Sequence, residues 1–98
     1  FIELQFDRSR AVAQAVIYWS LDAGIPRTSQ EVRFQIPDGQ TWKTVAEARP
    51  TDRVPATTIS LQVPVTADRF RLYQPAGKGP RGRTGLMWVR EVELSPPK

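Results

Sequence analysis

The sequence predicts an all-β domain, built as an antiparallel β-sandwich. Apolar and polar residues alternate with a period of two in several short segments, and none of the segments has a clear helical period over a useful length. The nine prolines fall between or at the ends of the apolar segments, where a missing amide proton does not disturb a strand ladder. At 98 residues the chain has room for one modest core, so we expect one domain or part of one.

The expected strands follow from this alternation. In the first, Ile2, Leu4 and Phe6 alternate with Glu3 and Gln5, which suits a strand with one face on a core. The other strands predicted in this way lie, in chain order, at residues 31–36, 58–63, 65–72 and 87–94.

The segment from Val12 to Trp19 has a different pattern, because apolar residues occupy both of its faces. This is typical of a central strand that is covered on each side. Alanines at near-helical spacing between Arg8 and Ile17 leave a helix as the alternative. The β-branched and aromatic residues of the segment favour the strand.

A hairpin is predicted at Pro37-Asp38-Gly39, between Ile36 and Trp42. Proline presets φ, and Asp-Gly tolerates the positive φ of a tight turn, so a strand over residues 41–46 should return along the previous one. At the other end of the chain, Ser95 to Lys98 is expected to be a tail or linker, which places the domain at residues 1–94.

The connection from Pro75 to Gly85 is the first candidate for a binding surface. It is a long loop rich in glycine and proline, and long loops inside compact domains are usually functional or mobile. Its basic side chains, Lys78, Arg81 and Arg83, are suited to carboxylate or sulfate groups. The alternative is a flexible, solvated loop with no ligand.

Composition excludes several kinds of chemistry. The chain contains no histidine and no cysteine, and therefore no imidazole base, no thiol nucleophile and no ordinary zinc site. No apolar run approaches the roughly 20 residues that cross a bilayer, and we expect no membrane partner. The net charge of +4 comes mostly from arginine and allows anionic partners, although a solubilising surface explains it equally well.

Two further groups of side chains are candidates for ligand binding. Trp19, Asp22 and Arg27 lie where a loop should leave the end of the apolar strand, and Tyr73 and Trp88 flank the basic loop as a possible stacking platform. Aromatic faces with a few polar groups are typical of sugar sites. The alternatives are that Trp19, Tyr73 and Trp88 pack in the sandwich and that Asp22 is a turn residue.

The order of these features resembles the discoidin, or coagulation factor 5/8 type C, domains, most closely the bacterial version appended to polysaccharide-degrading enzymes. The resemblance implies a galactose-binding-like jelly-roll sandwich, and it implies that Arg71 pairs with Glu91 or Glu93. The residues that carry it are Tyr18-Trp19, Asp22, Gly24, Pro37-Asp38-Gly39, Trp42-Lys43, Val65–Leu72 and Gly85–Leu94.

One departure from that family limits what the resemblance implies. Its members usually begin with an Asp-Gly and Thr-x-Trp stretch before the strand that residues 1–6 resemble, and no such stretch precedes Phe1 here. The chain is therefore expected to be an N-terminally incomplete part of a larger protein. Calcium, which that loop often binds in the family, is not carried over, and we expect no cofactor.

The function predicted from these observations is that of a non-catalytic accessory domain of a secreted or periplasmic glycan-degrading enzyme. Its expected partners are a polysaccharide or oligosaccharide, acidic if the basic loop takes part, and the catalytic module of the same polypeptide. The alternative is a purely structural domain that packs against that module. Nucleic-acid binding is not expected, because acidic residues are interleaved with the basic ones and no recognised motif occurs.

Overall fold

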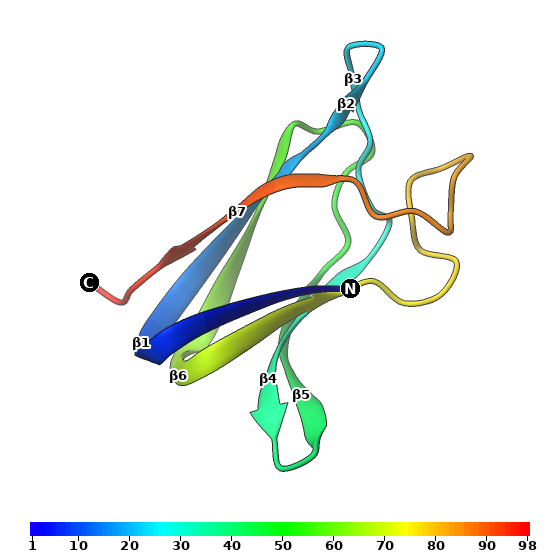
Figure 1. Cartoon of the computed structure of the whole chain (residues 1–98). Helices are drawn as coiled ribbons and strands as arrows, with labels where there is room; N and C mark the ends of the chain where they lie inside the picture. The colour runs from blue at the N-terminus through cyan, green and yellow to red at the C-terminus, as the bar shows by residue number, and fades with distance from the viewer.

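The computed structural model describes residues 1–98 and contains seven strands and no helix (Figure 1). Five strands form one antiparallel sheet in the order β5-β4-β6-β1-β7, and β2 and β3 form a separate hairpin. This confirms the predicted all-β, antiparallel class. The strands are β1 (Ile2–Trp19), β2 (Leu21–Asp22), β3 (Ile25–Pro26), β4 (Val32–Asp38), β5 (Thr41–Ala48), β6 (Ala56–Tyr73) and β7 (Val89–Ser95).

The two longest strands, β1 and β6, bend together and fold the five-stranded sheet into two layers (Figure 1). The first half of β1 pairs with the end of β6, starting at Ile2 opposite Leu72. The second half of β1 pairs with the start of β6, where Tyr18 lies opposite Ala56, and also with β7. One layer therefore contains β5, β4, the end of β6 and the first half of β1. The other layer contains the start of β6, the second half of β1 and β7.

Two irregularities in the pairing lie at this bend. Between Gln5 and Arg10, β1 has more residues than the facing part of β6. Between Val12 and Gln14, β6 has the extra residues, and these include Pro64. Bulges bend a strand and let it pass from one layer to the other. Pro64 is tolerated here because it lies in a stretch of β6 that has no partner on β1.

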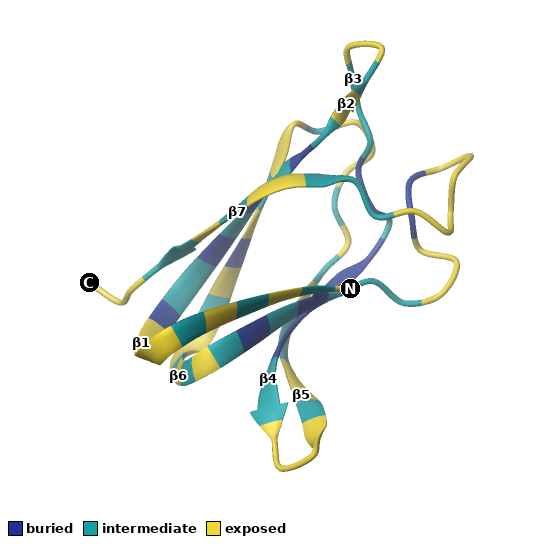
Figure 2. Ribbon diagram, in the orientation of Figure 1, coloured by how far each residue is buried: buried dark blue, intermediate teal, exposed yellow.

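The core lies between the two layers (Figure 2). Phe70 is at its centre: its ring stacks on that of Phe34, with centroids 5.5 Å apart, and meets the edge of Phe6 at 6.1 Å. Side chains from both layers complete it. The buried hydrophobic residues are Val12, Ala15, Ile17, Trp19, Val32, Phe34, Ile59, Phe70 and Leu72.

The predicted strands are present, but several of them are joined. Residues 2–6 and 12–19 belong to the single strand β1, and residues 58–63 and 65–72 belong to β6. The alternative helix between Arg8 and Ile17 does not form. The separate strands were inferred because the alternation breaks at the bend, where bulged residues interrupt the period of two while the chain stays extended.

The prediction that the segment from Val12 to Trp19 is covered on both faces is wrong. Ala15, Ile17 and Trp19 are buried, whereas Val16 and Tyr18, on the other face, are only half-buried. The layer that contains this half of β1 has the core on one side and no further layer on the other.

The hairpin between β4 and β5 is confirmed. Asp38 lies opposite Thr41, and Gly39 follows with φ of 63°, which a glycine adopts without strain. Pro37 lies inside β4, opposite Trp42, and not in the turn itself. The predicted tail begins one residue later than expected, since Ser95 is the last residue of β7.

Replacing Phe70 with alanine should lower the free energy of unfolding by about 3–5 kcal/mol, because it removes a fully buried ring from the core between the two layers. Urea denaturation of the purified chain measures this loss. Val63→Ala is the control on the same strand, because Val63 is 74% exposed and its truncation should change stability by less than about 0.5 kcal/mol. Equal losses for the two variants would contradict the two-layer core.

Candidate functional site

The basic loop between β6 and β7 is held against the segment that precedes β4. The backbone amide of Gln30 donates to the Lys78 carbonyl at 2.7 Å, and the side-chain amide of Gln30 donates to the Gly79 carbonyl at 2.9 Å. Gly79 and Pro80 are buried. The loop backbone is thus anchored at this point, in contrast to the alternative of a flexible, solvated loop, while the side chains of Lys78, Arg81 and Arg83 remain exposed.

A second contact fixes the two ends of the loop to each other. The Ser29 hydroxyl donates to the side-chain oxygen of Gln74, and the Gln74 amide donates to the Leu86 carbonyl at 2.9 Å. Ser29 is itself buried, so this chain of hydrogen bonds satisfies its hydroxyl.

Gly79 allows the loop to close on itself. A Cβ at this position would lie 2.4 Å from the Leu86 carbonyl oxygen and 2.6 Å from that of Thr84. Glycine has no Cβ and so lets a backbone approach a ligand or another segment closely. At Gly79, the close approach is to the other arm of the same loop.

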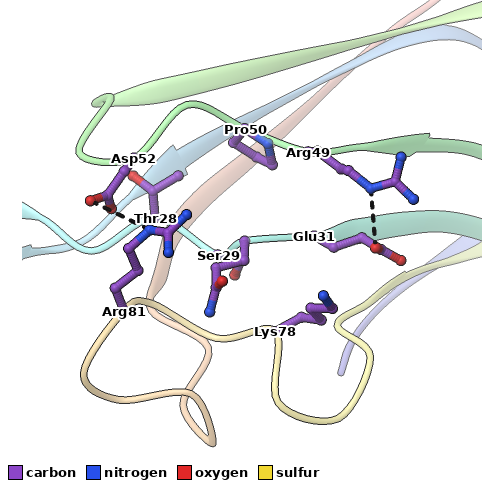
Figure 3. Close-up of a pocket in the computed structure, with 9 residues that line it drawn as sticks. Thr28, Ser29, Glu31, Arg49, Pro50, Asp52, Lys78 and Arg81 are labelled. Carbon is purple, nitrogen blue, oxygen red and sulfur yellow. Dashed lines mark ion pairs between the residues drawn. The ribbon is translucent and has the colours of Figure 1, made fainter.

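A polar cleft of about 270 Å³ lies where this loop meets two other segments (Figure 3). One wall comes from the segment before β4, one from the connection between β5 and β6, and one from the basic loop. No aromatic side chain lines it. The lining residues are Thr28, Ser29, Gln30, Glu31, Arg49, Pro50, Asp52, Lys78 and Arg81.

The charges of the cleft are only partly compensated. Glu31, whose side chain is 8% exposed, pairs with Arg33 at 3.1 Å and with Arg49 at 3.4 Å. Asp52 pairs with Arg81 at 4.0 Å (Figure 3). Lys78 makes no ion pair. Both acidic residues are thus matched by arginine, and the ammonium group of Lys78 is left to meet an anion.

Of the predicted ligand-binding residues, Lys78 and Arg81 come together in this cleft. Arg83 lies outside it, and its guanidinium carbon is 5.9 Å from the ring centroid of Trp88. Trp88 is half-buried, and its carbonyl accepts a hydrogen bond from the Ser20 amide. The structure therefore separates the basic residues of the loop into a pair at the cleft and one arginine beside Trp88.

Trp19 does not belong to a ligand site. It is 1% exposed and lies in the core, and its indole N–H donates to the Thr57 hydroxyl at 2.9 Å. This placement corrects its inclusion among the candidate residues: Trp19 alternates in phase with Ala15 and Ile17, so its side chain points between the layers.

Asp22 and Arg27 pair with each other on the small hairpin of β2 and β3, with an N···O distance of 3.1 Å. The two turn residues of this hairpin, Ala23 and Gly24, both have positive φ, as a tight two-residue turn requires. The pair lies outside the polar cleft, and its charges compensate each other.

Tyr73 and Trp88 do not form a common aromatic stack. The aromatic pairs of the structure are Phe6 with Phe70 and Phe34 with Phe70. Tyr73 instead lies beside Arg71, whose guanidinium carbon is 5.0 Å from its ring centroid.

The predicted pairing of Arg71 with Glu91 or Glu93 is wrong. Arg71 makes no ion pair, and its Nε donates to the side-chain oxygen of Gln35 at 2.8 Å. Arg71 lies at the end of β6, opposite Glu3, in the layer of β4 and β5. Glu91 and Glu93 lie on β7, in the other layer.

Most residues of the cleft were not predicted from the sequence. The polar run from Thr28 to Glu31 and the charged stretch from Arg49 to Asp52 both stand between strands, which was the only local signal. Neither run has a motif of its own. Their meeting with Lys78 depends on contacts between residues far apart in the chain, such as the hydrogen bond from Gln30 to Gly79 across 49 positions.

No group of three or more acidic side chains is close enough to hold a metal ion. Asp22, Glu31 and Asp52 each pair with an arginine. The structure also has no helix that is long and apolar enough to span a membrane.

No protein-family model, curated protein or solved structure matches this chain. The fold class therefore rests on the strand topology, and any function rests on the residues described above.

Replacing Gln74 with alanine should loosen the basic loop, because it leaves the buried Ser29 hydroxyl without its acceptor. We expect a stability loss of about 1–3 kcal/mol and faster hydrogen exchange at the Gly79 amide, which donates to Thr84 within the loop. Exchange measured by NMR tests this. Gln62→Ala, at an exposed position of β6, should change neither quantity. Unchanged exchange in the Gln74 variant would show that the side chain does not hold the loop.

Proposed function

We propose that this chain is a non-catalytic accessory domain that binds acidic carbohydrate at the polar cleft, within a secreted or periplasmic glycan-degrading protein. The observation that carries the proposal is the unpaired ammonium of Lys78 in a cleft whose other charges are compensated. A carboxylate or sulfate group of a sugar would complete that site. The family resemblance of the sequence supports the carbohydrate class.

The lining of the cleft suggests how such a ligand would be held. Arg49, Lys78 and Arg81 place their charged groups at the same cleft (Figure 3). The side chains of Gln30 and Ser29 also line it, but they are already engaged in hydrogen bonds to Gly79 and Gln74. Ion pairs and hydrogen bonds would hold the sugar, since no aromatic ring is available for stacking there. A small, solvated site of this kind gives weak binding, because few ligand atoms replace many water contacts.

A catalytic role has less support. Hydrolysis of a glycosidic bond needs two carboxyl groups, one of them free to donate a proton. Glu31 and Asp52 line the cleft, but each is engaged by an arginine. The chain also lacks histidine and cysteine for other acid–base or nucleophilic chemistry.

The second candidate function is structural packing against another module of the same polypeptide. An apolar groove of about 590 Å³ favours it, because Leu4, Phe6, Val92 and Leu94 line a recess between the first half of β1 and β7. The first half of β1 also pairs on one side only, with β6, and so leaves a free strand edge beside this groove. An unpaired edge next to an apolar recess is a common place for another chain segment to dock.

The double variant Lys78→Ala/Arg81→Ala tests the carbohydrate proposal. Binding of an oligogalacturonate, measured by calorimetry, should weaken about tenfold or more, because hydrogen bonds to charged groups contribute roughly 1.5–3 kcal/mol each. Raising the salt concentration from about 50 to 300 mM should weaken wild-type binding too. Neutral oligogalactan should bind more weakly than the uronate at low salt.

The matched control is Arg90→Ala/Lys98→Ala, which removes the same charge at two exposed positions away from the cleft. If both double variants lose affinity equally, the effect comes from net charge and the cleft is not the site. If the wild-type chain binds neither sugar, the packing function is the better interpretation.

A further inference from the structure

The outer face of the layer that contains β4 and β5 carries a second cluster of side chains that could bind a ligand, made of arginine and aromatic residues. Arg69, Arg71 and Tyr73 alternate along β6 with the buried residues Phe70 and Leu72, so their side chains point away from the core. This face lies on the opposite side of its layer from the buried core.

At the centre of this face, three aromatic rings surround one guanidinium group. The central carbon of Arg71 lies 4.7 Å from the ring centroid of Phe1, 4.9 Å from that of Trp42 and 5.0 Å from that of Tyr73. We call these four side chains the arginine-aromatic platform. Phe1 is 72% exposed, and Trp42, Tyr73 and Arg71 are half-buried. Aromatic rings around a guanidinium hold it in place and reduce its contact with water.

The other arginines of this face are already paired. Arg33 contacts Glu31 at 3.1 Å and Glu47 at 3.8 Å, and Arg69 contacts Asp68 at 3.9 Å. Arg71 has no acidic partner, and its one hydrogen bond, to Gln35, uses Nε. Its two Nη groups therefore remain free to donate. The platform offers one fixed, unpaired, bidentate donor in an aromatic setting.

We propose that the arginine-aromatic platform is a second anion site, which binds the carboxylate of a hexuronate unit while the sugar ring lies against Trp42 or Tyr73. The planar guanidinium matches a carboxylate through two parallel hydrogen bonds, and the aromatic rings match the C–H face of a pyranose. The choice of a uronate rests on the carbohydrate class of the proposed function. The site itself rests on the geometry around Arg71.

The charge distribution favours this ligand over a single-stranded nucleic acid. A phosphate backbone needs a row of unpaired cations beside the stacking rings. Here Arg33 and Arg69 are matched by acids, and Glu3 lies opposite Arg71 on β1. A ligand with one carboxylate beside a ring fits one free arginine.

The three tryptophans of the chain make this site separately measurable by NMR. The indole N–H of Trp42 reports on the platform, that of Trp88 on the basic loop, and that of the buried Trp19 on the integrity of the core. We expect trigalacturonate, added to the ¹⁵N-labelled chain, to shift the Trp42 signal and leave the Trp19 signal in place. Galactotriose should shift the Trp42 signal less than trigalacturonate does. An oligothymidylate should not shift the Trp42 signal more than trigalacturonate does.

Arg71→Gln should weaken the affinity read at Trp42 about tenfold or more. The matched control is Arg90→Gln, because Arg90 is an exposed arginine beside the ring of Tyr18 on the other layer, at 5.8 Å. This control should bind as the wild type does. If Arg71→Gln disturbs the Trp19 signal, and so the core, Arg71→Lys replaces it as the test variant. Arg71→Lys keeps the positive charge but loses the planar guanidinium group, and it should also weaken binding.

The same titration separates the two sites. Shifts of the Gln30 and Lys78 amides without a Trp42 shift would overturn the platform and leave the cleft. A Trp42 shift without those amide shifts would overturn the cleft as the carbohydrate site and leave the platform. A Trp42 shift that survives Arg71→Gln or Arg71→Lys, or that is larger with oligothymidylate, would also overturn the proposal.

Discussion

The coordinated bend of β1 and β6 is the constraint on which the rest of the structure depends. Because both strands bend together, one five-stranded sheet supplies both layers of the sandwich. The extra residues of β1 at the first pairing irregularity are balanced by the extra residues of β6 at the second. The pair Ile2–Leu72 before the bend and the pair Tyr18–Ala56 after it therefore belong to the same register. Without this bend, Phe70 and Trp19 would have no facing layer, and the sheet would leave one apolar face in water.

The bend also decides where the polar surfaces lie. It brings the end of β6 beside β4, so that the loop after Tyr73 crosses the segment before Val32 and closes the polar cleft. It leaves the first half of β1 as an outer strand of the same layer, where Phe1 reaches Arg71. The cleft and the platform are therefore two surfaces of one layer, and in each of them a basic side chain lacks an acidic partner.

Arginine has two different roles in this chain. Arginines engage Glu31 and Asp52 at the cleft and Asp22 on the hairpin of β2 and β3. In contrast, Arg71 at the platform and Lys78 at the cleft make no ion pair with an acidic residue. A resemblance to a family would assign Arg71 a structural ion pair, but its neighbours are aromatic rings and the amide of Gln35. Its surroundings, and not its place in the strand pattern, define its chemistry.

The sequence by itself determined the strand class, the hairpin at Gly39 and the basic character of the loop at Lys78, because a period of two and turn chemistry are local properties of the chain. Only the tertiary structure decided that Trp19 is core, that Arg71 meets Trp42 and that Gln30 holds the loop. These contacts join residues far apart in the chain, and they depend on a register that is set at the bend, where the local pattern is interrupted.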